Sequence, residues 1–158
     1  MSLTKEYFME ATEACPVIPA IKNDEWLEGC KESECGIVYI IYGDICTIAD
    51  IVDKVKEMGK KAIVHVDLIL GLSSKEISVD FIKKYTKADG IISMKPTLIK
   101  RANELGMFTI QRFYMMDALT YANIVKHVKN CNPDVSSSCR RDCPKSYNIY
   151  WKRLTSRW

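Results

Sequence analysis

Five apolar runs recur along the chain at the spacing of one strand plus one helix, and each run ends in a polar or charged residue. The runs are continuously aliphatic rather than alternating, which is typical of parallel strands whose two faces are both covered. The pattern therefore predicts an α/β protein with a parallel sheet. The predicted strands are 17–22, 37–44, 62–67, 90–95 and 108–112.

The segments between the first three runs carry helix signals. Asn23 or Asp24 is placed to cap a short helix, and Thr47 to cap a longer one in which aliphatic residues recur every three or four positions. Gly59 follows that stretch, as glycine does at helix C-termini. Single helices that join parallel strands predict right-handed crossovers.

The later segments continue the alternation. Ser73 and Glu76 have the spacing of a capping box, and Pro96 suits the first turn of a further helix that Gly106 ends. Asp117 is expected to begin a fifth helix, either as its N-cap or as a site residue. The chain thus contains five to six βα units.

Polar residues gather where the predicted strands end. The carboxyl ends of parallel strands meet on one face of an α/β sheet or barrel, and this face carries the ligand site. We therefore expect a binding site, without catalytic residues or a metal, that is formed by Lys22, Asp44, His65, Asp67, Lys95, Gln111 and Arg112.

Two of these residues lie close together in the sequence. His65 and Asp67 are two apart on a predicted strand, so their side chains should point to the same face. They are interpreted either as ligand contacts or as a core histidine held by a carboxylate, because buried charges are usually paired.

The remaining candidates have equally ordinary alternatives. Lys22, Lys95 and Arg112 are cations suited to a phosphate monoester, or they are solvated charges at strand ends. Asp44 is a hydroxyl acceptor or a turn residue after a flexible glycine, and Gln111 donates to a sugar-like hydroxyl or completes a polar layer.

Composition limits the class of protein. A chain of 158 residues with 47% hydrophobic residues suits one domain. No signal sequence and no apolar run of membrane-spanning length is found, which predicts a cytoplasmic protein without a membrane partner. The seven cysteines form no CxxC pair, so most should be reduced, and Cys46 is expected to be a small buried filler.

The C-terminal 24 residues, 135–158, differ from the rest of the chain in hydrophobic pattern and in charge. They hold six basic residues and one acidic, out of 23 and 20 in the whole chain, which leaves 17 basic and 19 acidic residues in the body. The overall charge of +3 is therefore no sign of a nucleic-acid footprint on the folded part. The sequence predicts a partial (β/α) barrel domain over 1–134 and an atypical basic tail over 135–158.

The tail has two interpretations. It is a solvated extension, or it results from a reading-frame shift, because the codons of 154–158 overlap a neighbouring frame that can spell Ile-Asn-Ile-Pro-Leu. In the second interpretation the tail replaces a sixth βα unit and a seventh strand.

Several motifs resemble the glycerol-3-phosphate-responsive antiterminators. They are PVIPAIK at 16–22, GD at 43–44, KAIVHVDLI at 61–69 followed by GL, DGIIS at 89–93 with a lysine at 95, LIK at 98–100 and TIQRFYMMDA at 109–118. The resemblance extends from Pro16 to about Asp134.

The resemblance implies a TIM-barrel-like (β/α)8 architecture, here incomplete, and a regulator rather than an enzyme. Such a regulator binds glycerol 3-phosphate, needs no cofactor, and engages the leader mRNA of a glycerol-use operon to prevent transcription termination. RNA binding is inferred from the resemblance alone, because the sequence contains no recognised RNA-binding signature.

The sequence departs from the family in two places. A Ser-Thr-Arg/Lys-Ser-Asn type of stretch after the fourth strand is replaced by Ser93-Met94-Lys95-Pro96-Thr97. The family's Val-Leu-Pro-Gly segment and Gly-Gly loop are missing, so the chain is interpreted as C-terminally truncated or frameshifted. Barrels of this kind usually hold phosphate with their last loops, so this cradle is expected to be lacking.

Two further expectations follow. An enzyme that acts on a small phosphorylated sugar or polyol, with His65 as acid or base and Asp67 orienting it, is the alternative function. An incomplete barrel exposes strand edges, which predicts self-association into a homo-oligomer.

Overall fold

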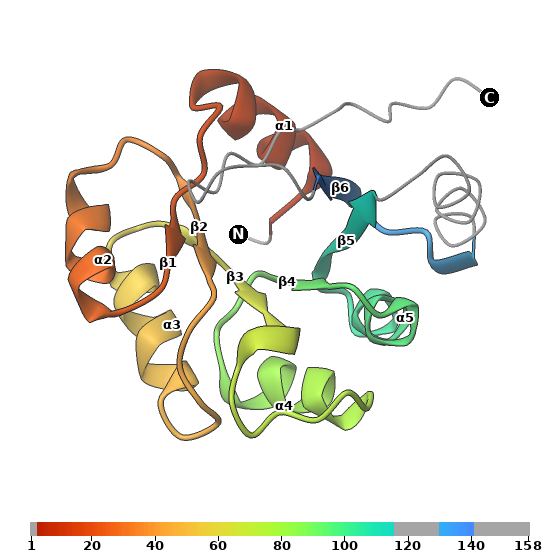
Figure 1. Ribbon diagram of the computed structural model, residues 1–158. Helices are drawn as coiled ribbons and strands as arrows, with labels where there is room; N and C mark the ends of the chain where they lie inside the picture. The colour runs from red at the N-terminus through yellow and green to blue at the C-terminus, as the bar shows by residue number, and fades with distance from the viewer. Residues whose placement is uncertain (1–2, 116–129, 141–158) are drawn as a thin grey trace.

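The computed structural model describes residues 3–115 and 130–140, which form one parallel sheet with helices on both faces (Figure 1). The helices are α1 Lys5–Ala14, α2 Asp24–Gly29, α3 Ile48–Glu57, α4 Ile77–Tyr85 and α5 Pro96–Glu104, with short 3-10 helices η1 Cys30–Glu32 and η2 Val66–Leu68. The strands are β1 Ala20–Ile21, β2 Ile37–Ile40, β3 Lys61–His65, β4 Gly90–Ser93, β5 Phe108–Met115 and β6 Val135–Arg140.

The six strands are all parallel and pair in sequence order, from β1 to β6. Figure 1 shows them as a curved row, with α2 to α5 along its outer side and α1 across its inner side. The predicted parallel α/β architecture is confirmed. The sheet does not close on itself within the described residues, because β1 and β6 are its two ends and do not pair with each other.

Separate apolar layers cover the two faces of the sheet. On the outer face, Val38, Val64 and Ile91 belong to one buried cluster with residues of α2, α3, α4 and α5. On the inner face, Ile63 and Ile110 belong to a second cluster with residues of α1. Burial on both faces explains why the strands are continuously aliphatic.

The helix α1 was not predicted from the sequence. Thr4 caps it by accepting a hydrogen bond from the N–H of Tyr7, and Phe8 is its fully buried side chain. The ring of Phe8 stacks on that of Phe108 in β5, with 5.1 Å between the centroids. A single aromatic contact thus fixes α1 against the sheet.

All five predicted strands are present, and each overlaps its predicted range. Asn23 caps α2 as expected, and Gly59 and Gly106 take positive φ values of 74° and 65° after α3 and α5. The predicted helix after Asp117 lies outside the described residues.

Three local predictions are wrong. Thr47 occupies the N-cap position of α3, but its side chain makes no capping hydrogen bond to the helix. In the preceding turn, Oδ1 of Asp44 accepts hydrogen bonds from the N–H groups of Cys46 and Thr47. Glu76 precedes α4 without a side-chain cap, so no capping box forms with Ser73. Cys46 is exposed rather than a buried filler.

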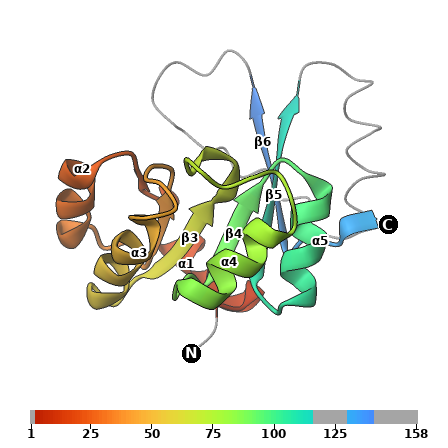
Figure 2. The same ribbon diagram turned by 90° about the horizontal axis from the view of Figure 1, so that it is seen from below.

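The strand β6 occupies the first six residues of the segment predicted as a tail. It begins after Asp134, just as β4 begins after Asp89. Both aspartates bond to the start of a neighbouring strand: Asp89 Oδ2 accepts from the N–H of Ala62 at 2.9 Å, and Asp134 Oδ2 from the N–H of Thr109 at 2.9 Å. Because the same type of aspartate contact precedes both β4 and β6, we conclude that 135–140 is a regular strand of the sheet, which lies beside β5 (Figure 2).

No helix in the described ranges is long and apolar enough to cross a membrane.

We predict that Asp134→Ala lowers the free energy of unfolding by about 1–3 kcal/mol, because the N–H and Oγ1 of Thr109 both lose their bond to the carboxylate. Urea unfolding would measure the change. Asp53→Ala is the matched control: it removes a largely exposed ion pair with Lys87, so it should change stability by under about 0.5 kcal/mol. Equal effects of the two substitutions would contradict the role of Asp134.

Candidate functional site

Polar residues at the carboxyl ends of β3 and β4, together with a neighbouring position inside β5, form a connected cluster. His65 ends β3, Asp67 follows it in η2, Ser93 ends β4, and Arg112 lies in β5. These elements are neighbours in the sheet, so parallel pairing brings their ends together. This cluster is the candidate functional site.

His65 occupies the centre of the cluster. It is 2% exposed and follows Ile63 by two residues, so its side chain lies on the inner face of the sheet. Its Nε2 lies 3.4 Å from NH1 of Arg112. An arginine side chain only donates hydrogen bonds, so Nε2 is the acceptor and Nδ1 carries the proton.

The imidazole is neutral at ordinary pH. The pKa of His65 is lowered to about 4, mainly by burial; the nearby Arg112 acts in the same direction, while Asp67 opposes both effects. Nδ1 lies 3.9 Å from Oδ2 of Asp67 and has no hydrogen-bond partner among the described residues. A buried N–H without a partner is costly, so this atom is available to a ligand oxygen.

Asp67 is held by the end of β4. Its carboxylate accepts hydrogen bonds from Oγ of Ser93 at 3.0 and 3.1 Å and from the N–H of Met94 at 2.8 Å. Because Asp67 lies in a 3-10 helix, strand alternation is not the reason that it faces His65, although the prediction that the two are close is confirmed.

Ser93 joins this network and was not among the predicted site residues. It is fully buried, and its Oγ also accepts a hydrogen bond from the N–H of Lys95 at 3.0 Å. Its position at the end of the GIIS strand was the signal available in the sequence.

Lys95 extends the site toward the loop before α4. Its side chain is half-buried, and its Nζ donates to Oγ of Ser74. Together with Arg112 it supplies two cations around the single carboxylate of Asp67. This balance favours an anion.

Three predicted residues do not join the cluster by any hydrogen bond or ion pair within residues 3–115 and 130–140. Lys22 is exposed, with its Nζ 4.5 Å from the centre of the Trp26 ring. Asp44 bonds to its own turn, and its pKa is lowered first by the hydroxyl of Thr47 and then by the N–H groups of Cys46 and Thr47. The turn interpretation of Asp44 is thereby the one that the structure supports.

Gln111 takes a different position from its neighbour Arg112. Successive side chains of a strand alternate, so Gln111 lies on the outer face with Thr109, while Arg112 lies on the inner face. Gln111 is fully buried, and neither amide atom has a hydrogen-bond partner among the described residues. It does not face His65.

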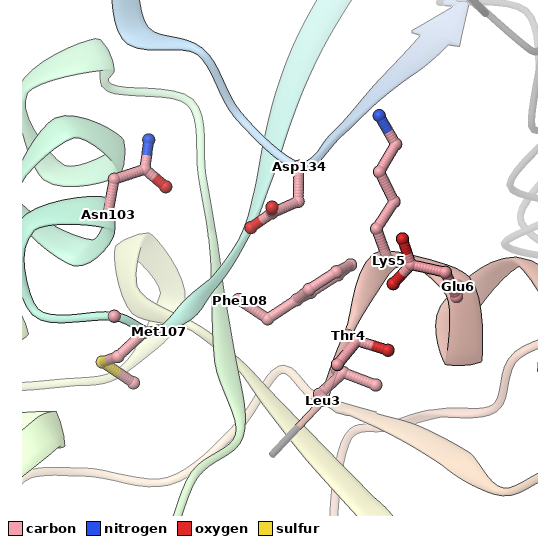
Figure 3. Close-up of a pocket in the computed structure, with 9 residues that line it drawn as sticks. Leu3, Thr4, Lys5, Glu6, Asn103, Met107, Phe108 and Asp134 are labelled. Carbon is pink, nitrogen blue, oxygen red and sulfur yellow. The ribbon is translucent and has the colours of Figure 1, made fainter.

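A pocket of about 410 Å³ lies at the other end of the strands (Figure 3). Residues of the first turn of α1 lie across it from Phe108 and Asp134. Asp134 and Asn103 already bond to Thr109, so these polar groups support the fold. None of the predicted site residues lines this pocket.

No group of three or more histidine, cysteine or acidic residues in the described part of the chain is arranged to hold a metal ion. The side chains of the cluster are instead suited to bind an anion with hydroxyl groups. Arginine and lysine attract the charge, and the neutral imidazole and the carboxylate supply hydrogen bonds.

The fold and this cluster define a parallel α/β protein with a group of polar and charged side chains at the strand ends. Residues 17–137 match the model of the family described as glycerol-3-phosphate responsive antiterminator, and the chain belongs to this family. The family is regulatory rather than catalytic.

One curated relative is similar over much of the chain. The uncharacterized protein YgcP of Escherichia coli (strain K12) is 45% identical over 119 residues, which are 75% of this chain and 62% of YgcP. The chain therefore spans less than two thirds of that relative.

Solved structures are similar as well. The crystal structure of the glycerol uptake operon antiterminator regulatory protein from Listeria monocytogenes str. 4b F2365 matches with a TM-score of 0.73 and 28% identity, over 77% of this chain and 65% of that one. A glycerol uptake operon antiterminator-related protein from Thermotoga maritima MSB8 matches with a TM-score of 0.70 and 25% identity, over 77% and 68%.

We predict that His65 makes stability depend on pH. Its folded pKa of about 4 lies below the unfolded value of 6.5, so between these pH values only the unfolded chain binds the proton. The free energy of unfolding should therefore fall by roughly 3 kcal/mol as the pH drops from above 6.5 to about 4. Urea unfolding of the wild type and His65→Gln over this range would isolate the contribution as the difference between the two slopes.

A direct titration provides the control for this prediction. Ring signals of His65 and of the other histidine, His127, are separated in the NMR spectrum by comparison with His65→Gln. A His65 signal that titrates near pH 6.5 would contradict the buried, neutral imidazole.

Proposed function

We propose that this protein binds glycerol 3-phosphate at the cluster of His65, Asp67, Lys95 and Arg112, and that the bound ligand controls its association with the leader mRNA of a glycerol-use operon. Binding to the mRNA prevents transcription termination. Family membership and the similarity to two glycerol uptake operon antiterminator proteins support the proposal.

The observation that carries the ligand proposal is the contact between Arg112 and His65. A guanidinium beside a neutral imidazole keeps its charge available, because the imidazole accepts a hydrogen bond without neutralising it. A phosphate monoester accepts two parallel hydrogen bonds from such a group. Lys95, which lies between β4 and α5, adds a second cation.

The glycerol part of the ligand requires groups that bond to hydroxyls. The Nδ1–H of His65 is a donor without a partner among the described residues, and the carboxylate of Asp67 has two acceptor oxygens. Both groups are buried on the strand ends, so a hydroxyl that reached them would be shielded from water. Selectivity for a phosphorylated polyol over free phosphate would follow.

The same network offers a path from ligand to fold. Asp67 joins the end of β3 to the end of β4, and Lys95 joins β4 to the loop before α4 through Ser74. A ligand that bonds to Asp67 and Lys95 would order both loops together. Such ordering affects mRNA binding only if the ligand prefers one arrangement of the loops over another.

The proposal extends to the architecture. The curved row of sequentially ordered strands with α2 to α5 outside it supports a TIM-barrel-like fold, of which these six strands are a part (Figure 1). The protein acts in the cytoplasm in this proposal, where the mRNA is made. Contact of Lys22, Asp44 or Gln111 with the ligand, and self-association, stay predictions.

We predict that Arg112→Gln weakens glycerol 3-phosphate binding about 10-fold or more, since a hydrogen bond to a charged group contributes about 1.5–3 kcal/mol. Isothermal titration calorimetry would measure the affinity. Lys95→Met should have a similar effect, whereas Lys87→Met, an exposed lysine paired with Asp53, should leave the affinity unchanged.

Glycerol and inorganic phosphate are the matched ligands for this titration. Weak binding of each alone and tight binding of the ester are expected from a site that contacts both parts. Unchanged affinity in both the Arg112 and the Lys95 variants would reject this cluster as the site.

We predict that glycerol 3-phosphate increases the retention of leader mRNA at least several-fold and leaves the ligand chemically unchanged. Filter binding with labelled leader mRNA, with glycerol as the control ligand, would measure retention, and phosphorus NMR would detect turnover. Conversion of the ligand would favour the alternative of a barrel enzyme. Retention that is equal with and without ligand would contradict the sensor mechanism even if the ligand binds.

A further inference from the structure

A pair of thiols lies far from the candidate site, where α1 ends. Cys15 follows α1 directly, and Cys35 precedes β2. Cys15 is a close neighbour of the Cys35 thiol and raises its pKa, while Sγ of Cys15 donates a hydrogen bond to the carbonyl of Val17 at 3.4 Å. Cys35 is 1% exposed, whereas Cys15 is only half-buried and packs against the same apolar cluster.

The pairing of β1 with β2 brings the two segments that lead into these strands side by side. Ala20 pairs with Tyr39 and Ile21 with Ile40, and the N–H of Tyr39 bonds to the carbonyl of Pro19. If this parallel register is continued toward the N-terminus, residue 16 lies opposite Cys35. The neighbouring Cys15 is therefore within one residue of the facing position.

Contacts on either side hold this region in place. The hydroxyl of Tyr7, in α1, lies 2.9 Å from where a Cβ would stand on Gly36. The buried amine of Lys60 donates hydrogen bonds to the carbonyl oxygens of Ser33 and Cys35, at 2.6 and 2.8 Å. Both elements that carry the thiols are thus fixed, and the positive charge of Lys60 lies beside Cys35.

We propose that Cys15 and Cys35 are a modification site, at which a low-molecular-weight disulfide such as oxidised glutathione converts the two thiols into a reversible intramolecular disulfide. The half-buried Cys15 meets the oxidant first, and the buried Cys35 completes the bond. The resulting staple fixes the end of α1 to the start of β2.

The exchange proceeds in two balanced steps. The thiolate of Cys15 attacks one sulfur of oxidised glutathione, which forms a mixed disulfide and releases one glutathione. The thiolate of Cys35 then attacks the Cys15 sulfur and releases the second glutathione, and the two released glutathione thiolates take up the two protons that the cysteine thiols lose. The protein loses two electrons and two protons, and oxidised glutathione is reduced to two thiols.

The second step is favoured by proximity and slowed by burial. Burial raises the pKa of the Cys35 thiol, and the charge of Lys60 acts in the opposite direction. The attacking sulfur lies near its target, because Cys15 packs against the apolar cluster that contains Cys35. Glutathione thiols reverse the reaction, which makes the bond responsive to redox poise.

The disulfide would act on the inner face of the sheet. There α1 is held by the stacking of Phe8 on Phe108 and by few other buried side chains. A covalent link at its C-terminal end closes the segment between Cys15 and Cys35 and restricts the unfolded chain. Oxidation should therefore stabilise the packing of α1 without touching the residues of the ligand site.

The test is oxidation of the full chain with oxidised glutathione, followed by alkylation and mass spectrometry without reduction. A peptide that joins Cys15 to Cys35, lighter by two hydrogen atoms, is expected in the wild type and in Cys46→Ser. Cys46 is exposed, so it serves as the matched control cysteine. The thermal midpoint of the oxidised chain should rise by about 5 to 10 °C and return after reduction.

Cys15→Ser and Cys35→Ser should each abolish the cross-link and the rise in the midpoint. Cys15→Ser keeps the buried thiol in place, so it is informative even if Cys35→Ser fails to fold. The proposal is overturned if Cys46 takes up glutathione while Cys15 and Cys35 stay unlinked. Pairing of either residue with another cysteine, or a cross-link between two chains, would overturn it as well.

Discussion

Coverage of the sheet on both faces is the constraint on which the rest of this structure depends. The outer face packs against α2 to α5, and the inner face packs against α1. Charged groups are then tolerated only where a strand leaves the sheet, because burial without a partner would cost several kcal/mol. The chemistry of the protein is consequently concentrated at the strand ends.

Carboxylates have different roles at the two ends of the strands. At the amino ends, Asp89 and Asp134 bond to the first residues of the neighbouring strands and so align the sheet. At the carboxyl ends, Asp67 bonds to Ser93 and still faces the imidazole of His65. The carboxylates at the amino ends therefore bond to the protein itself. At the carboxyl ends, Nδ1 of His65 is a buried donor without a hydrogen-bond partner among the described residues.

Neutral histidine gives the candidate site its electrostatic character. A protonated imidazole beside Arg112 would add repulsion in a region shielded from water, and burial prevents this by lowering the pKa to about 4. The guanidinium keeps its charge and the imidazole acts as a polar contact. This pairing of a charged donor with a neutral imidazole is the basis for the proposed binding of an anion that carries hydroxyl groups.

The residue composition of each strand explains which strands could be predicted. Aliphatic runs with polar ends determined the strands β1 to β5, because a fully buried parallel strand has almost no other composition. The strand β6 could not be predicted from aliphatic composition, because its sequence is rich in serine and begins the atypical segment. It nevertheless pairs with β5 through the same kind of backbone hydrogen bonds as the other strands. These bonds join backbone N–H and carbonyl groups of two adjacent strands, so they do not require aliphatic side chains.

The sequence by itself thus determined the element order, the polar strand ends and the proximity of His65 to Asp67. Only the tertiary structure decided that Arg112 faces the imidazole while Gln111 points away from it, because strand alternation relative to the inner face depends on register. It also decided that Ser93 supports Asp67 and that Cys15 meets Cys35. These contacts join residues 20 or more positions apart, and the distance between such residues is set by the packing of the elements that carry them.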